Sequence, residues 1–440
     1  MKVLKFGGTS VGSAQRIKNV AKLITNGEQK LVVLSAMAGT TNILVEISDY
    51  LYKKNPDGAN EVINRLETQY RKHINELYST ETYKQKTSDA LKAQFEFIRS
   101  YTKDLFTLFE EKVILAQGEL MSTCMMTNYL QEQGVKVELL PALEFMRTDK
   151  NGEPDPVYIK EKLNAQLDLH PGADIYITQG FICRNAYGEI DNLQRGGSDY
   201  TASLIGAAIH TDEIQIWTDI DGMHNNDPRF VNHTEPVPRL QFEEAAELAY
   251  FGAKILHPTC IQPAKYANIP VRLLNTMDPS VQGTLISNDL VSDTIKAVAA
   301  KDNITAIKIK SGRMLLAYGF LRKVFEIFES YQTSIDMICT SEVGVSVTID
   351  NTTHLNEIID DLKKYGTVTV DKNMCIICVV GDLEWSNVGF EANALDAMRD
   401  IPVRMISFGG SNYNISFLVK EEDKKRALQS LSNHLFNNKI

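Results

Sequence analysis

Lys5-Phe-Gly-Gly-Thr-Ser10 stands where the apolar run Val3 to Phe6 stops and a helical pattern over residues 13–25 begins. A strand that ends in two glycines and leads into a helix is typical of layered α/β domains. Adjacent glycines let a backbone approach a phosphate closely, and the helix N-terminus adds N–H donors. An ordinary tight turn has the same pattern, but Lys5 at the strand end could meet a transferring phosphoryl group. Neither G-x-x-x-x-G-K-[ST] nor G-x-G-x-x-G is present in this segment.

Outward from this segment, residues 1 to about 290 alternate β-rich runs with helical patterns, which predicts a layered α/β domain. Residues 41–129 are helical in pattern almost throughout, with an interruption only near 55–57. Further buried strands are expected at residues 31–35, 135–140, 175–178 and 213–218. In open α/β sheets, ligands bind at the carboxyl ends of the strands. Candidate functional residues should therefore follow these strands.

After residue 284 a strand-helix-strand-strand unit occurs twice, and Ile335-Asp-Met-Ile338 matches Val403-Arg-Met-Ile406. Such repetition indicates two small α+β modules, expected at residues 304–373 and 374–440. The elements expected in the first module are a strand at 304–310, a helix at 320–331 and strands at 334–339 and 344–349. Those expected in the second are a strand at 375–380, a helix at 389–398 and strands at 402–407 and 413–419.

Composition and charge exclude several classes of protein. A net charge of −10 over 440 residues argues against nucleic acid or an anionic membrane as the main partner. No apolar run reaches the ~18 residues of a membrane span, and the N-terminus lacks a signal-peptide core, so a cytosolic protein is expected. Six cysteines without regular spacing do not indicate a disulfide framework. Cys375 and Cys378, three residues apart on a strand, face opposite sides, which favours core residues over a metal pair.

Two further small-residue turns follow the same logic. Ser35-Ala-Met-Ala-Gly-Thr-Thr-Asn42 comes directly after a buried strand, and Arg195-Gly-Gly-Ser-Asp-Tyr-Thr201 precedes an apolar helix. Glycines and hydroxyls suit an anion cradle, but Asp199 is unfavourable there unless it pairs with a lysine or a metal ion. Lys5 or Mg²⁺ could be that partner. The alternative is a capped helix start, with Ser198 or Asp199 as the N-cap.

Two segments are candidates for contacts with a nucleotide. Residues 218–229 follow a strand and contain several acidic or amide side chains near Gly222, but their order misses the calcium-loop pattern. A turn that presents backbone groups and Arg229 to a nucleotide fits better. Lys254 follows the helical pattern that begins at Phe242, and it is either solvated or points into the site.

Taken together in this order, the motifs resemble the aspartokinase family; they are Lys5-Phe-Gly-Gly-Thr-Ser10, Ser35-Ala36, Gly118-Glu-Leu120, Arg195-Gly-Gly-Ser-Asp199, Thr218-Asp-Ile-Asp-Gly222 and Gly252-Ala-Lys254. The resemblance runs from residue 2 to the C-terminus. It implies an amino acid kinase-like α/β/α catalytic domain at 1–290 and two C-terminal ACT-like modules, with a strand from about 295–300 joining the second. The implied reaction transfers the γ-phosphate of ATP to the side-chain carboxylate of L-aspartate, the first step toward lysine, threonine and methionine.

The resemblance also implies roles for individual residues. Lys5 and Asp199 would be catalytic. ATP would be held by Lys5, Gly7, Gly8, Thr218, Asp219, His224, Arg229 and Lys254, and Mg²⁺ would be bound with it. Aspartate would be held by Ser35, Thr41, Glu119, Arg195 and Ser198.

The residue types agree with this chemistry. Arg195 can grip the α-carboxylate bidentately, and Glu119 can pair with the α-ammonium. The attacking carboxylate has a reference pKa of ~3.9, so it is ionised at neutral pH and needs no general base. Positioning and charge neutralisation by Lys5 and Mg²⁺ remain as the catalytic task.

Within the family, the C-terminal half most resembles the lysine-inhibited type. The implied effector contacts are Met314, Ala317, Phe320, Leu321, Ser334, Ile335, Asp336, Ser341 and Glu342, with Asp336 pairing with the ammonium groups of lysine. Three residues depart from the family pattern: Leu316 and Ala317 replace polar residues, and His224 replaces a tyrosine. A homodimer or tetramer through the ACT modules is expected, and dimerisation without a ligand is the alternative role for them.

Two other functions remain as alternatives. A different amino acid kinase, acting on glutamate, acetylglutamate or carbamate, would share the fold and the glycine turns. The two ACT-like repeats and the residue sequence of the motif Lys5-Phe-Gly-Gly-Thr-Ser10 argue against it. An amino-acid-sensing regulator without catalysis is the second alternative, and the presence of every polar position needed for turnover argues against that.

Overall fold

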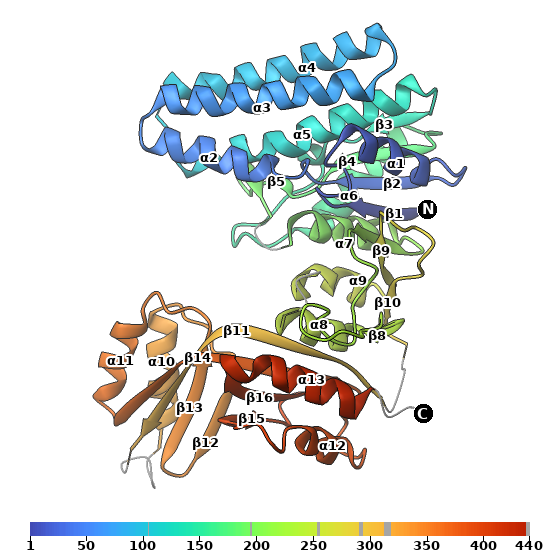
Figure 1. Cartoon of the computed structure of the whole chain (residues 1–440). Coiled ribbons are helices and arrows are strands. Elements are labelled where there is room, and N and C mark those ends of the chain that lie inside the picture. The colour runs from blue at the N-terminus through green and yellow to red at the C-terminus, as the bar shows by residue number, and fades with distance from the viewer. Residues whose placement is uncertain (104, 194–195, 253–255, 290–293, 312–317, 437–440) are drawn as a thin grey trace. The chain divides into compact units, whose positions relative to one another are not determined.

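The computed structural model describes residues 1–103, 105–193, 196–252, 256–289, 294–311 and 318–436. These residues form two compact units, one of residues 1–222 and 256–288, the other of residues 223–255 and 289–440 (Figure 1). The sequence placed the catalytic domain continuously over 1–290. Residues 223–255 group with the C-terminal unit because their helix α8 (Phe242–Tyr250) packs on the strands β11 (Ile295–Lys310) and β14 (Thr367–Gly381).

The first unit is built on a mostly parallel sheet. Its parallel strands lie in the order β3 (Val137–Leu139), β4 (Ile175–Gln179), β2 (Lys30–Leu34), β1 (Lys2–Phe6), β7 (Ile214–Thr218) and β9 (Val271–Asn275), and β10 (Thr284–Ser287) pairs antiparallel with β9. Every residue of β2 and β4 is buried, as expected for strands covered by helices on both faces. The carboxyl ends of the central strands therefore meet at one edge of the sheet.

Helix α1 (Ala14–Ile24) follows the first glycine turn and begins where the sequence predicted. The hydroxyl of Ser13 accepts a hydrogen bond from the backbone N–H of Arg16 and so caps the helix. Ile17 and Val20 are fully buried on the face that packs on the sheet. The fixed start of α1 holds the preceding loop, residues 7–12, at the end of β1.

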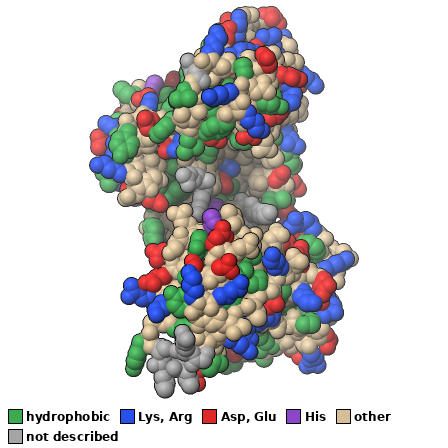
Figure 2. Space-filling view, turned by 90° about the vertical axis from the view of Figure 1, so that its left-hand side faces the viewer, with side chains coloured by type: hydrophobic (Ala, Val, Ile, Leu, Met, Phe, Trp, Pro, Cys, Tyr) green, Lys and Arg blue, Asp and Glu red, His purple; other side chains and the backbone are tan. Residues whose placement is uncertain are grey.

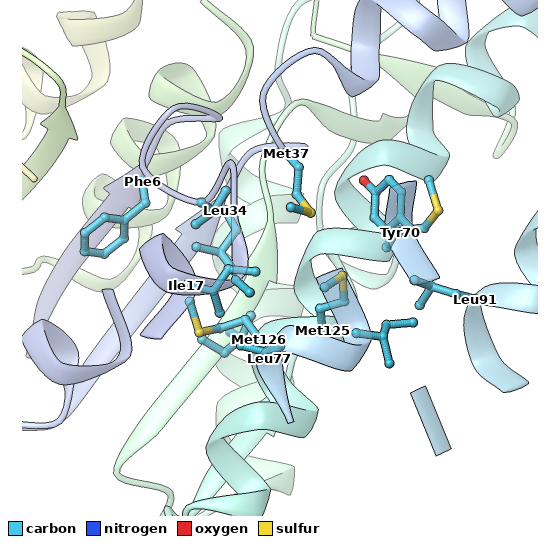
Figure 3. Packing of buried hydrophobic residues seen from close by; sticks show 14 of the residues in the cluster. Phe6, Ile17, Leu34, Met37, Tyr70, Leu77, Leu91, Met125 and Met126 are labelled. Atoms are coloured by element: carbon cyan, nitrogen blue, oxygen red, sulfur yellow. The ribbon is translucent and has the colours of Figure 1, made fainter. Parts of the chain in front are cut away.

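The predicted helical region forms four helices, α2 (Thr40–Tyr52), α3 (Pro56–Leu77), α4 (Glu81–Ser100) and α5 (Leu108–Glu132). In Figure 1, α3 and α4 lie side by side, and both contribute to the same core as the sheet. Figure 3 shows how Tyr70, Leu77, Leu91 and Met125 of these helices pack in that core with Leu34 of β2. The sequence analysis missed the breaks at residues 78–80 and 101–107. This shared core fixes α5, which carries Glu119, against the end of β2.

The second unit contains an antiparallel sheet in the order β12-β13-β11-β14-β16-β15. Its strands are β11, β12 (Ile338–Ser341), β13 (Gly344–Ile349), β14, β15 (Met405–Ser407) and β16 (Asn414–Lys420), and its helices are α8, α10 (Phe320–Ser330), α11 (Leu355–Lys363), α12 (Phe390–Ala397) and α13 (Lys424–Leu435). The strand predicted at 304–310 is the second half of β11, which runs for 16 residues. Its first half, from Ile295 to Lys301, pairs with Gly381 to Ile376 of β14. The strand predicted at 334–339 is shorter, because β12 starts only at Ile338.

Each repeat buries its own apolar cluster under this sheet. One cluster contains Phe320 and Val345, and the other contains Cys375 and Phe417. Burial raises the pKa of the Cys375 and Cys378 thiols well above the usual range, as expected for core cysteines. Across the described residues, no helix is long and apolar enough to cross a membrane. On the face in Figure 2, acidic and basic side chains are interspersed.

Candidate active site

Lys5 and Asp199 form an ion pair at the carboxyl edge of the sheet. Lys5 is near the end of β1, and Asp199 lies in the first turn of α7 (Gly197–Ile209). The Nζ atom of Lys5 is 2.6 Å from Oδ1 of Asp199, and the two side chains are 12% and 14% exposed. The N-cap of α7 is Gly196, in the left-handed conformation, so neither Ser198 nor Asp199 caps the helix. Lys5 is thus the cation that an acidic residue in this loop requires.

The loops after β1 and β2 lie unusually close together. A Cβ atom built on Gly8 would lie 2.8 Å from the carbonyl oxygen of Ala36, so a larger residue would push the loops apart. The backbone N–H of Ala38 donates to the carbonyl of Gly8 at 3.1 Å. Gly7 donates to the carbonyl of Trp217 at 3.3 Å, which ties the same loop to β7. These contacts fix the backbone of residues 7 and 8 against the loop after β2 and the end of β7.

A cavity of about 510 Å³ opens beside Lys5. Residues of the loops after β1, β2 and β4 and of the helices α2, α5 and α7 surround it. The hydroxyl of Ser35 donates to the hydroxyl of Ser198 at 2.9 Å across it. The lining residues are Lys5, Gly8, Thr9, Ser35, Ala36, Met37, Ala38, Gly39, Thr41, Asn42, Glu119, Phe181, Gly196, Gly197 and Ser198. Five side chains that the sequence analysis assigned to catalysis or to aspartate binding therefore share one cavity: Lys5, Ser35, Thr41, Glu119 and Ser198.

Glu119 is the buried carboxylate of this cavity. Its side chain is 4% exposed, and Oε1 accepts a hydrogen bond from the backbone N–H of Ala36 at 3.1 Å. Oε2 has no hydrogen-bond partner among the described residues. Burial raises the pKa of Glu119 to about 7, although the Ala36 N–H and the charge of Lys5 lower it. A buried carboxylate with one open oxygen is suited to a cationic ligand.

The sequence analysis missed several residues of the cavity. Phe181 lines it and adopts a φ of 67°, which is rare for a side chain of this size. Its N–H donates to the hydroxyl of Thr201 at 3.0 Å, which holds the residue in place. A Cβ on the neighbouring Gly180 would lie 2.4 Å from Ser198. Only glycine at position 180 therefore lets the start of α7 approach the end of β4 this closely. The position of residues 180 and 181 just after a buried strand was the signal that could have found them.

The predicted nucleotide contacts are divided between the two units. Thr218 ends β7 in the first unit, and its hydroxyl donates to Oδ1 of Asp219 at 3.2 Å. His224 and Arg229 belong to the second unit. Arg229 is paired there with Asp227, Nε to Oδ1 at 3.0 Å and a terminal nitrogen to Oδ2 at 2.7 Å. Arg195 and Lys254 lie outside the described residues.

The predicted effector contacts differ in exposure. Phe320 is buried in the core under α10, whereas Leu321, Ser334, Ser341 and Glu342 are exposed and Ile335 is half-buried. The side chain of Asp336 is only 1% exposed. Met314, Leu316 and Ala317 lie outside the described residues. Asp336 is therefore an acidic side chain buried inside the second unit.

Comparison with known proteins identifies the families of both parts of the chain. Residues 1–275 match the model of the amino acid kinase family, and residues 377–435 match an ACT domain model. The chain is 36% identical to aspartokinase 1, chloroplastic, of Arabidopsis thaliana over 462 residues, covering 99% of this chain and 80% of the relative. It is 32% identical to the lysine-sensitive aspartokinase 3 of Escherichia coli K12 over 447 residues, covering 99% of both chains.

Solved structures give the same result over the whole chain. The crystal structure of E. coli aspartokinase III with aspartate and ADP superposes with a TM-score of 0.84 at 32% identity, covering 99% of this chain and 100% of the other. The structure of the same enzyme with lysine and aspartate gives a TM-score of 0.82, covering 99% of each chain. Both the layered α/β unit and the ACT-containing unit thus have counterparts in these proteins.

Proposed function

Because the chain belongs to the aspartokinase family, and so phosphorylates the side-chain carboxylate of L-aspartate with ATP, we propose that the cavity beside Lys5 is its aspartate site. The observation that carries this proposal is the pairing of opposite charges across one cavity. Glu119 supplies an unpartnered buried carboxylate oxygen, and Lys5 supplies an ammonium group. L-aspartate carries both an ammonium group and the carboxylate that must meet the phosphate.

In this arrangement the α-ammonium of aspartate pairs with Glu119, whose Oε2 has no hydrogen-bond partner among the described residues. The hydroxyls of Ser35 and Ser198, which already share a hydrogen bond, can turn to donate to a carboxylate. Arg195 is proposed for the α-carboxylate, because a guanidinium binds carboxylates through two parallel hydrogen bonds. The β-carboxylate then faces Lys5 with its charge intact.

Phosphoryl transfer from this position needs positioning and neutralisation of charge. An oxygen of the β-carboxylate attacks the γ-phosphorus, the bond to the bridging oxygen of ATP breaks, and ADP leaves. Lys5 lies near the end of β1, and its ion pair with Asp199 holds the ammonium group in place. Gly8 lines the same cavity as Lys5, and the phosphates are proposed to lie beside it. Lys5 thus stabilises negative charge that develops during transfer.

Mg²⁺ enters such reactions bound to the phosphates of ATP, where it neutralises their charge. The described residues contain no group of three or more His, Cys, Asp or Glu side chains that could hold a metal ion. The carboxylate of Asp199 is already paired with Lys5. This donor set fits a metal held mainly by phosphate oxygens and water, with Asp199 as the candidate protein ligand.

The choice of acceptor is tested directly. With ATP, Mg²⁺ and hydroxylamine, the purified protein should form aspartyl hydroxamate, because hydroxylamine traps acyl phosphates. Glutamate is longer by one methylene, so its carboxylate would not lie at the same place when its α-ammonium pairs with Glu119. We therefore expect kcat/KM to be at least about tenfold lower. Hydroxamate formed from glutamate as fast as from aspartate would overturn the proposed site.

For the second unit, we propose feedback inhibition by L-lysine bound at Asp336, with ACT modules of two chains associating. Lysine at millimolar concentration should lower the rate, and Asp336→Asn should raise the half-inhibiting concentration at least about tenfold, because a charged hydrogen bond is lost. Asp360→Asn, an exposed change on α11, is the matched control and should leave inhibition unchanged. Inhibition by threonine alone, or a fully sensitive Asp336→Asn variant, would contradict the assignment.

A further inference from the structure

The carboxylate of Asp336 is bound by an ammonium group of the chain itself. Its Oδ1 accepts a hydrogen bond from Nζ of Lys301, on β11, at 2.7 Å. The hydroxyl of Tyr250, the last residue of α8, donates to the same oxygen at 2.7 Å. The Lys301 ammonium also lies 4.3 Å from the centre of the Tyr250 ring, a cation–π contact. Lys301 and Tyr250 together close off Asp336.

This arrangement leaves Asp336 only half satisfied. Its Oδ2 is buried and has no hydrogen-bond partner among the described residues. A buried carboxylate with an open oxygen costs free energy that another donor would recover. Lys301, in contrast, has a second partner, Oδ2 of Asp350 at 2.9 Å, which is on a side chain 42% exposed. Lys301 can therefore leave Asp336 and remain paired at the surface, whereas Asp336 requires a replacement cation.

The two repeats differ at this position, because the first has a buried carboxylate and the second does not. Arg404 stands at the position that the repeat matches to Asp336, and its Nε binds Oδ2 of Asp371 at 2.9 Å. The charges are reversed, and the side chains are 31% and 45% exposed. Only the first repeat thus offers a buried anion to an ammonium ligand at this place.

From these contacts we propose that Lys301 is an internal competitor of the effector. Its ammonium occupies Asp336 when no ligand is bound, and an amino acid with an ammonium group must displace it to bind. This inference deepens the proposed lysine site and rests on that proposed function. An internal competitor raises the apparent Kd of the site for its ligand. The apparent Kd equals the intrinsic Kd divided by the fraction of the protein in which the site is free.

The exchange also affects α8. Gly252, two residues beyond Tyr250, has a φ of 136°, and a Cβ there would lie 2.2 Å from the carbonyl oxygen of Ala300. The end of α8 therefore lies close against β11 at Gly252, and a second tie runs from Tyr250 through Asp336 to Lys301 of β11. A ligand that takes Asp336 removes the second tie. The chain continues from Gly252 to Lys254, one of the proposed nucleotide contacts, so the freed end of α8 gives the effector a route to the kinase reaction.

The test measures lysine binding to the full-length protein by calorimetry without substrates. Lys301→Met keeps the length of the side chain and removes the ammonium, so the Kd for lysine should fall about tenfold or more. Lys296→Met, on the same strand but bonded to Thr294, is the control and should bind like the wild type. Tyr250→Phe should bind lysine at least as tightly as the wild type while the kinase becomes less sensitive to inhibition.

A second measurement needs no variant and covers the case in which Lys301→Met does not fold. Acetylation of Lys301, followed by peptide mass spectrometry, should accelerate when lysine saturates the wild-type protein. The reference is taurine at the same amine concentration, because its amine consumes the acetylating reagent to the same extent. Unchanged acetylation together with equal or weaker lysine binding by Lys301→Met would overturn the competitor role and leave the lysine site standing. If lysine binds neither wild type nor variant, both proposals fail.

Discussion

Replacing Lys5 with methionine is expected to lower kcat for aspartate phosphorylation by at least about 10²–10³-fold, the loss typical when one preorganised donor to the transition state is removed. Lys5 is the last residue but one of the first strand, and its ammonium is 2.6 Å from Asp199, so it is fixed before substrate arrives. The KM for aspartate should change less than kcat, because the lost interaction is strongest while charge moves between oxygens. Steady-state kinetics of the purified variant measure both values.

The control for this variant lies on the same strand. Lys2 is 39% exposed, its nearest carboxylate is Glu28 at 3.8 Å, and Lys2→Met should leave kcat unchanged. Circular dichroism and thermal melting should show that Lys5→Met is folded, although unpaired Asp199 will cost some stability. A folded Lys5→Met variant with the kcat of the wild type would remove Lys5 from the mechanism.

Much of the first unit could be predicted because its local patterns agree with its packing. The strand of Val3 to Phe6, the helix capped by Ser13 and the strand beginning at Leu31 match the structure to within a residue or two. The break between α3 and α4 could not be found, because residues 78–80 lack glycine and proline and continue the polar-apolar pattern. The start of α5 did carry a local signal that the sequence analysis missed, because Thr107 and Glu110 form a capping box there.

The candidate site was predictable to the extent that it follows strand ends. Lys5, Ser35 and Ser198 share one cavity because parallel strands place their carboxyl ends at one edge. The pairing of Asp336 with Lys301 and Tyr250 was beyond the sequence, since it joins three distant segments through tertiary packing. The strand predicted from Ser334 is also too long, because β12 begins only at Ile338 and the buried Asp336 lies before it.

Replacing Glu119 with glutamine should weaken aspartate binding and stabilise the empty protein. The KM for aspartate should rise on the order of 10–100-fold, because the α-ammonium loses a charged partner in a buried site. The free energy of unfolding of the empty protein should increase in the variant. Burial raises the pKa of Glu119 from 4.5 to about 7, which shows that its ionised form is unfavourable in the folded protein. Glutamine has nearly the same shape and carries no charge to bury.

The pH dependence distinguishes this effect from a change in packing. The folded wild type holds the Glu119 proton to a higher pH than the unfolded chain, so its stability falls as pH rises from about 4.5 to 7. The loss is about 3 kcal/mol once both states are ionised, from about 1.36 kcal/mol per pKa unit. Thermal melts without ligand should therefore show a stability advantage of Glu119→Gln that grows between pH 5 and pH 8.

Aspartate binding should follow the opposite trend over the same range. Because the ammonium group needs the ionised form of Glu119, the affinity of the wild type for aspartate should fall as pH drops below about 7. The affinity of Glu119→Gln should stay low and nearly constant. Glu61→Gln, on an exposed position of α3, should change neither curve. If the affinity of the wild type were flat from pH 8 to pH 5, Glu119 would not be the partner of the substrate ammonium, because a buried carboxylate cannot take up a proton and still bind a cation unchanged.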